Sequence, residues 1–131
     1  MKNIFKDNTK NYIYGGLYGS SGSYVINKIS SNYDNTIILL NNNSEIVNFS
    51  NELKLFSGED KKISQFLEIE SFPYESFIYD INILSERLKT YKNIINVKKN
   101  IIVTSYSAVS KYLTPKDTIV NNFYQINKEC K

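Results

Sequence analysis

Several residue types that carry chemistry in proteins are absent or rare in this chain of 131 residues. There is no histidine, which removes the commonest general base, the commonest metal ligand and any Ser-His or Cys-His dyad. The single cysteine, Cys130, cannot form a disulfide within the chain, so we expect a reducing compartment such as the cytosol. No apolar run approaches the roughly 20 residues of a membrane helix and the N-terminus does not resemble a signal peptide, so we expect no membrane partner.

Charge of one sign does not dominate. Sixteen lysine and arginine residues face thirteen acidic ones, and the net charge is +3. The cations are spread along the chain, with doublets only at Lys61-Lys62 and Lys98-Lys99. A dedicated nucleic-acid binder usually has a higher pI and a clustered basic face, so we expect weak DNA binding or none.

The abundant residues are those with A/T-rich codons, namely Asn, Ile, Lys, Tyr and Phe, whereas arginine occurs once, at Arg87. This bias indicates a low-G+C genome such as a reduced bacterial one, and we expect a bacterial cytoplasmic protein. The eleven tyrosines are scattered. Core packing and codon bias explain them better than base stacking does.

The chain is long enough for one domain, and its 41% hydrophobic residues allow a real core. Polar residues 1–11 are expected to form a flexible tail, 12–120 the main lobe, and 121–131 the start of a truncated following lobe. Strands are predicted at 12–14, 36–40, 63–69 and 100–104, with one more beginning within 118–126. Helices are predicted between them, at about 24–29, 44–56, from 80 onward, and 107–113. This alternation predicts an α/β fold with a parallel sheet flanked by helices.

Local signals refine these elements. Thr36–Leu40 and Asn100–Thr104 are continuous apolar runs, which are typical of strands buried on both faces. Ser44 is the expected N-cap of its helix, and Gly58 is expected to end that helix in a left-handed conformation. In the helix that begins at Asp80, one apolar face is predicted, made of Ile81, Leu84, Leu88 and Tyr91.

A glycine-rich stretch precedes the first predicted helix, where a phosphate-binding loop would lie. With Gly16 as the first glycine of the G-x-x-x-x-G-K-[ST] motif, Ser21 falls on the second glycine, Gly22 on the lysine and Ser23 on the magnesium-binding hydroxyl. Lys28 lies more than a helical turn further on, so no amine takes the lysine's place. We therefore expect no ATP hydrolysis. A residual anion site and a turn kept only for its geometry both stay open.

The segment Gly16-Leu17-Tyr18-Gly19-Ser20 resembles the degenerate loop in the N-terminal module of bacterial transcription-repair coupling factors. That module is related to UvrB, the damage-recognition subunit of the excision nuclease, and has lost its ATP site. The resemblance implies a RecA/UvrB-like lobe with a degenerate phosphate loop at Gly16, Gly19, Ser20, Ser21, Gly22 and Ser23.

Three further segments carry the resemblance. The run from Glu70 through Pro73, Tyr74 and Glu75 to Phe77 is similar to the family's W-E-T-L-P-Y-D loop with its trailing Ser-Phe, although Ile69 replaces the tryptophan and Tyr79 a frequent proline. Ile83–Leu88, with Ser85, Arg87 and Leu88, resembles an I-I-S-x-R-L helix. Val103–Val109 and Leu113–Pro115 resemble a strand, helix and proline segment.

The full family protein is an ATP- and magnesium-dependent DNA translocase that releases stalled RNA polymerase and recruits UvrA. Its motor and polymerase-binding domains lie beyond this region, and the UvrA contact lies in the following lobe. The resemblance thus implies a non-catalytic scaffold lobe without a cofactor of its own, whose partners are the remaining domains of the coupling factor. An exposed apolar patch is expected where those domains dock.

Plainer interpretations of the same residues stay open. Pro73-Tyr74 fits a rigid turn with a packed tyrosine, and Arg87 fits a side chain that caps a loop carbonyl as well as one that acts in recognition. Two other classes of protein also remain: an ATP-binding UvrB-like excision nuclease or helicase fragment, and an unrelated small α/β interaction domain.

Overall fold

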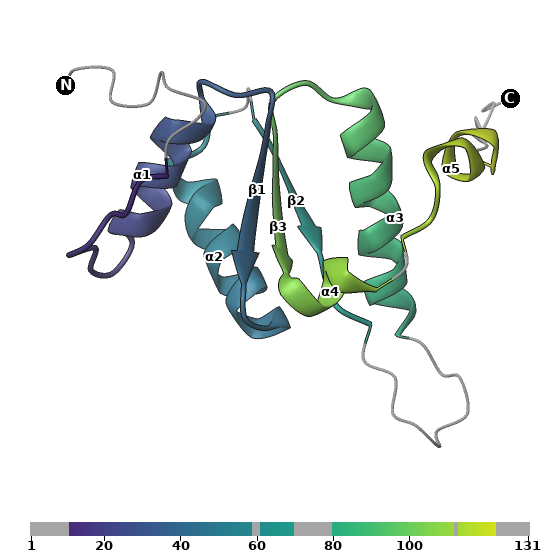
Figure 1. Cartoon of the computed structure of the whole chain (residues 1–131), viewed down its shortest axis with the longest axis horizontal. Coiled ribbons are helices and arrows are strands. Elements are labelled where there is room, and N and C mark those ends of the chain that lie inside the picture. Colours follow the sequence, from purple (N-terminus) through teal and green to yellow (C-terminus); the bar gives the residue numbers. More distant parts are fainter. Residues whose placement is uncertain (1–10, 59–60, 70–79, 112, 123–131) are drawn as a thin grey trace, which may run out of the picture.

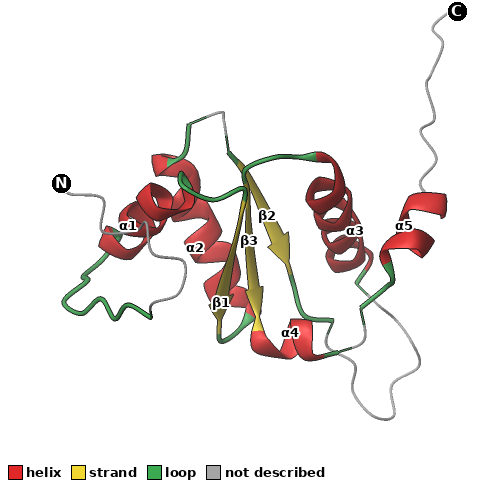
Figure 2. Cartoon of the chain, turned by 45° about the horizontal axis from the view of Figure 1, so that its top comes forward, coloured by secondary structure: helices red, strands yellow, loops and turns green. Residues whose placement is uncertain are grey.

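The computed structural model describes residues 11–58, 61–69, 80–111 and 113–122. Its helices and strands follow in the order α1 (Ser21–Ser30), β1 (Asn35–Leu40), α2 (Asn43–Phe56), β2 (Lys62–Phe66), α3 (Ile81–Asn96), β3 (Asn100–Ser105), α4 (Tyr106–Ser110) and α5 (Lys116–Asn122). The sheet separates α1 and α2 from α3, α4 and α5 (Figures 1 and 2).

The three strands form a parallel sheet in the order β1-β3-β2. Asn35 is in register with Asn100, as is Lys62 on the other side, so β3 lies between the two other strands. All six residues of β3 are buried. The predicted α/β class with a parallel, helix-flanked sheet is confirmed, and so is the buried strand predicted at 100–104.

One face of the sheet carries the larger core. The long helix α2 packs on β2 and β3, and α1 packs mainly on α2. The buried members of this larger core are Ile38, Ile46, Leu53, Leu67, Ile101 and Val103. The opposite face has a smaller core, in which α3 and α4 pack on β2 and β3. Its buried members are Phe66 and Ile102 of the sheet and Ala108 of α4.

The strand β1 is open on the α3 side. Ile37 is 65% exposed and Leu39 is 57% exposed, whereas Ile38 between them is 8% exposed. The prediction that Thr36–Leu40 is buried on both faces is therefore wrong. An apolar run does not distinguish an edge strand from a central one, and β1 lies at the edge, beyond the part of the sheet that α3 contacts.

The apolar face predicted for α3 is turned largely to solvent. Of the four predicted residues, Ile81 is 79% exposed, Leu84 and Leu88 are about half exposed, and Tyr91 alone packs on the smaller core. Arg87 and Thr90, by contrast, are buried. The polar side chains are buried because each finds a backbone partner: Arg87 donates to the Leu67 carbonyl and Thr90 to the Gln65 carbonyl, both on or just after β2. The available hydrogen-bond partners, and not the apolar periodicity, thus determine which face of α3 is buried.

Both predicted ends of α2 need correction. The N-cap is Asn42 rather than Ser44, because the Asn42 side chain accepts a hydrogen bond from the Glu45 amide at 2.9 Å. At the other end, Ser57 has an extended backbone and its amide donates to the Leu53 carbonyl. Among the glycines at 15–58, only Gly16 and Gly19 have positive φ, so Gly58 does not supply the expected left-handed cap.

Other boundaries also differ. Residues 12–14 form no strand, and the strand expected to begin within 118–126 is replaced, as far as residue 122, by α5. The helix expected at 107–113 is α4, and the strand expected at 63–69 is the shorter β2. The helix expected from 80 onward is α3, and Asp80 is its N-cap, because its side chain accepts from the Asn82 amide. The loop-like run from Glu70 to Phe77 lies outside the described residues, as do nearly all of the expected tails.

No helix within the described ranges is long and apolar enough to cross a membrane.

Candidate functional site

The glycine-rich stretch forms a turn that precedes α1. Gly16 and Gly19 have φ of 72° and 53°, the left-handed region that glycine adopts without strain. The helix begins at Ser21, whose hydroxyl donates to the Tyr18 carbonyl at 2.7 Å, and the N-cap Ser20 makes no side-chain cap bond. Gly22 lies in the first turn of α1, with open space where a Cβ would be added.

The Ser23 side chain is not available to a ligand at this turn. It is fully buried between α1 and α2, and its hydroxyl donates to the Glu52 carboxylate at 2.7 Å. The helix interface continues through Asn27, whose amide donates to the Phe56 carbonyl at 2.6 Å. The hydroxyl that would hold magnesium in a working phosphate loop is thus engaged within the protein.

Lys28 does not replace the missing loop lysine. Its amine lies 5.5 Å from the centroid of the Tyr24 ring, on the exposed side of α1. With glycine at position 22 and Ser23 hydrogen-bonded to Glu52, the residues at this turn do not fit ATP with magnesium. Among the described residues there is also no group of three or more acidic or thiol side chains that could hold a metal ion.

A second group of polar residues lies at the carboxyl end of the sheet, where parallel α/β proteins bind ligands between strands whose connections leave in opposite directions. Such a point lies between β1 and β3, because α2 follows β1 to one face and α4 follows β3 toward the other. Asn42 caps α2, and Ser105 caps α4 by accepting from the Ala108 amide. The motifs of the sequence did not predict a site at these strand-end residues.

Most of these polar groups bind one another. The Asn43 side chain both accepts from the Glu68 amide and donates to the Glu68 carbonyl, which ties the start of α2 to the end of β2. Lys111 forms a 3.1 Å ion pair with Glu68. A hydrogen bond from the Ser107 hydroxyl, together with Lys111, lowers the pKa of the Glu68 carboxyl below its ordinary value. This end of the sheet is therefore held by a polar latch of Asn43, Glu68, Ser107 and Lys111.

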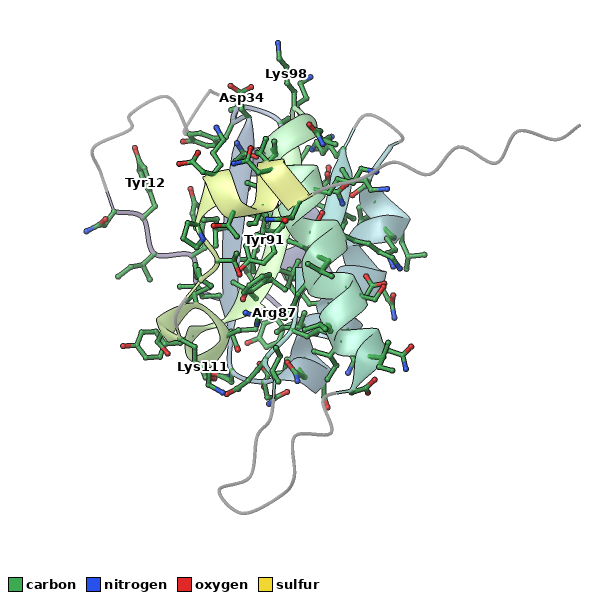
Figure 3. The ribbon with its side chains drawn as sticks, turned by 90° about the vertical axis from the view of Figure 1, so that its right-hand side faces the viewer. Tyr12, Asp34, Arg87, Tyr91, Lys98 and Lys111 are labelled. Carbon is green, nitrogen blue, oxygen red and sulfur yellow. The ribbon has the colours of Figure 1, made fainter. Side chains whose placement is uncertain are left out.

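Arg87 lies beside this latch. Its guanidinium carbon is 3.8 Å from the centroid of the Phe66 ring, and one of its nitrogens donates to the Leu67 carbonyl at 2.7 Å. Burial lowers the pKa of the guanidinium, while Tyr91 and Glu68 act in the opposite direction. Tyr91, Arg87 and Lys111 follow one another toward the carboxyl end of the strands (Figure 3). This geometry matches the carbonyl-capping alternative for Arg87.

The other family-motif residues are dispersed. Ser85 is half-buried on α3 and Leu88 is half exposed, whereas Pro115 is exposed and its carbonyl accepts from the Ile119 amide at the start of α5. Glu70, Pro73, Tyr74 and Glu75 lie outside the described residues. The structure thus does not bring the described motif residues into one site.

Comparison with the models of known protein families and with curated proteins finds no match to this chain.

Proposed function

We propose that this chain is a non-catalytic scaffold lobe related to the first, UvrB-like lobe in the N-terminal module of transcription-repair coupling factors. The described segments that resemble the family lie in helices and strands of the kinds that the resemblance implies. Ser85, Arg87 and Leu88 fall in α3, Val103–Val109 runs from β3 into α4, and Pro115 directly precedes α5. The proposed pathway is transcription-coupled nucleotide excision repair.

The hydrogen bond between Ser23 and Glu52 carries the non-catalytic part of this proposal. Catalysis by a phosphate loop requires a lysine amine at the terminal phosphates and a free hydroxyl for magnesium. Gly22 has no side-chain amine, and the buried Ser23 hydroxyl is hydrogen-bonded to the Glu52 carboxylate on the neighbouring helix. The turn is then a degenerate loop that serves to connect the amino-terminal segment to α1.

Uncovered apolar surface supports the scaffold part. Ile37 and Leu39 leave one side of β1 open, and Ile81, Leu84 and Leu88 line a shallow groove on α3 together with Ser85, Lys89 and Lys92. Extended apolar surface of this kind marks protein contacts. The proposed partners are the remaining domains of the coupling factor. In this proposal UvrA and RNA polymerase are contacted through other regions of the coupling factor.

One observation favours a second candidate, a small α/β interaction domain unrelated to coupling factors. A phosphate loop connects a strand to a helix, but residues 12–14 form no strand in front of the glycine turn. In that case the turn never bound a phosphate, and the apolar surfaces would contact a different protein.

Titration with a fluorescent ATP analogue, with and without magnesium, tests these alternatives. We expect no binding by the natural chain up to about 1 mM, a concentration that would detect even a weak site. Micromolar binding by the natural chain would overturn the non-catalytic proposal and favour an ATP-binding UvrB-like protein.

The variant Gly22→Lys separates the two remaining candidates, with Gly15→Lys as the matched control because both positions have open space for a side chain. If the turn descends from a phosphate loop, Gly22→Lys should gain weak, magnesium-independent binding that Gly15→Lys lacks. Equal behaviour of the two variants would count against the coupling-factor relationship and favour the unrelated domain.

A further inference from the structure

The outer edge of β1 is a strand-pairing surface without the usual protection. Within the described residues no strand pairs with this edge, which faces the viewer in Figure 1. Natural edge strands are normally protected by charged residues, proline or bulges. Asn35–Leu40 contains no charged residue and no proline, and it pairs in unbroken register with β3.

Exposed side chains make the same strand apolar on its open face. Ile37 and Leu39 point to the side that no helix covers, and they are 65% and 57% exposed. A strand that pairs with β1 would extend the sheet by hydrogen bonds and would cover part of these side chains. The best occupant is an uncharged strand whose exposed face is also apolar, and β1 itself has this chemistry.

We propose that two copies of this chain pair through β1 in an antiparallel, two-fold symmetric manner, giving a continuous six-stranded sheet. In a two-fold interface the same patch meets itself, so one self-complementary strand is sufficient. With the axis at Ile38, Ile37 of one copy lies opposite Leu39 of the second copy on the same face of the sheet. The two open apolar faces then become continuous.

No like charges meet along the paired strands in this arrangement. With the axis at Ile38, Asn35 of one copy lies opposite Asn41 of the second copy, and Asp34, the one charged residue within 34–42, lies opposite the uncharged Asn42. The pairing depends only on β1 and holds whether or not the chain is related to coupling factors.

Sedimentation of the full chain over a range from about 1 µM to 1 mM tests the proposal, since this range spans weak to moderate self-association. We expect a monomer–dimer equilibrium that Ile37→Lys weakens at least about tenfold, because the variant places two charges on the joined apolar face. Position 37 is exposed, so the variant should keep the circular dichroism spectrum of the natural chain. The matched control is Leu55→Lys, at a position on α2 that is 80% exposed and remote from the edge.

Disulfide trapping tests the register. In a Cys130→Ser background, an oxidised equimolar mixture of Ile37→Cys and Leu39→Cys chains should form mainly the mixed dimer, because directly opposite residues have the spacing that a disulfide requires. Homodimers forming as readily as the mixed dimer would contradict this register.

Three other outcomes would overturn the proposal. The chain could stay monomeric over the whole range, or its dimer could survive Ile37→Lys, or Leu55→Lys could weaken the dimer equally. Hydrogen exchange identifies one further occupant. If the chain is monomeric and its β1 amides exchange faster in the Ile13→Pro variant than in the natural chain, the chain's own amino-terminal segment covers the edge instead.

Discussion

Arg87 on α3 stacks over Phe66 on β2, with its guanidinium carbon 3.8 Å from the ring centroid and a 2.7 Å hydrogen bond to the next carbonyl, that of Leu67. The ring of Phe66 also meets Tyr91 edge-on, at 5.3 Å between centroids. A single arginine thus joins the helix to the end of β2 through its planar face and through its nitrogens. A lysine has no planar guanidinium, so it cannot stack on Phe66 and donate to the Leu67 carbonyl in the same geometry at once.

Replacing Arg87 by methionine should lower the free energy of unfolding by about 2–3 kcal/mol, because the Leu67 carbonyl loses a charged donor and Phe66 loses its stacked partner. Arg87→Lys should rescue only part of this loss. Urea denaturation monitored by circular dichroism measures both variants. Lys89→Met is the control, since its ion pair with Glu86 is exposed and should contribute less than about 0.5 kcal/mol. A loss from Arg87→Met no larger than that of the control would refute a structural role for the stack.

The α1–α2 interface gives a second prediction. Ser23→Ala removes the donor to Glu52 from a fully buried position and should cost about 1–2 kcal/mol. In a double-mutant cycle with Glu52→Ala, the double variant should lose less than the sum of the two single losses, because each single change already breaks the bond. Ser21→Ala, which breaks an exposed bond to Tyr18, is the control. Additive losses from positions 23 and 52 would mean that their hydrogen bond does not stabilise the helix pair.

The alternation of apolar runs with helical periodicity was enough to predict a parallel, helix-flanked sheet, because a helix between two strands returns the chain to the end of the sheet where the first strand began. The same pattern does not give strand order. Ile37 and Ile102 belong to equally apolar runs, yet one is exposed at the edge and the other is buried at the centre. The two residues differ in burial because β3 pairs with both other strands of the sheet, whereas β1 lies at its edge.

Buried polar side chains account for the wrong face predicted for α3 and for the missed latch. Ser23, Asn27, Arg87 and Thr90 are all buried, each with a hydrogen-bond partner from a distant part of the chain. Hydrophobic periodicity places such residues at the surface, so it assigned the wrong face to α3. The polar latch around Glu68 was missed for the same reason, although the asparagines and serines that follow the two apolar runs were a usable signal.

The latch predicts a dependence of stability on pH. The pKa of Glu68 is lowered in the folded chain, mainly by the Ser107 hydroxyl and then by Lys111. The stabilisation is therefore fully present above the ordinary value of about 4.5 and is lost as the pH falls through the lower folded value. Glu68→Gln should flatten this loss when urea midpoints are measured from pH 6 down to about pH 3, the range in which carboxylates titrate. Glu86→Gln, which removes an exposed ion pair, should leave it unchanged. If the natural and Glu68→Gln chains lose stability in parallel as the pH falls, Glu68 is not the source of this pH dependence.

Adjacent isoleucines in β1 provide the sharpest test of the edge position. Ile38→Ala removes a side chain that is 8% exposed and packed in the larger core, and it should cost about 2–4 kcal/mol. Ile37→Ala removes the same atoms from a position that is 65% exposed, so its cost should stay below about 1 kcal/mol. Both unfolding free energies should be measured at the lowest practicable concentration, so that self-association through β1 contributes little. Equal costs at low concentration would mean that a further part of the chain covers the open face of β1, and the edge would then be unavailable to a second copy.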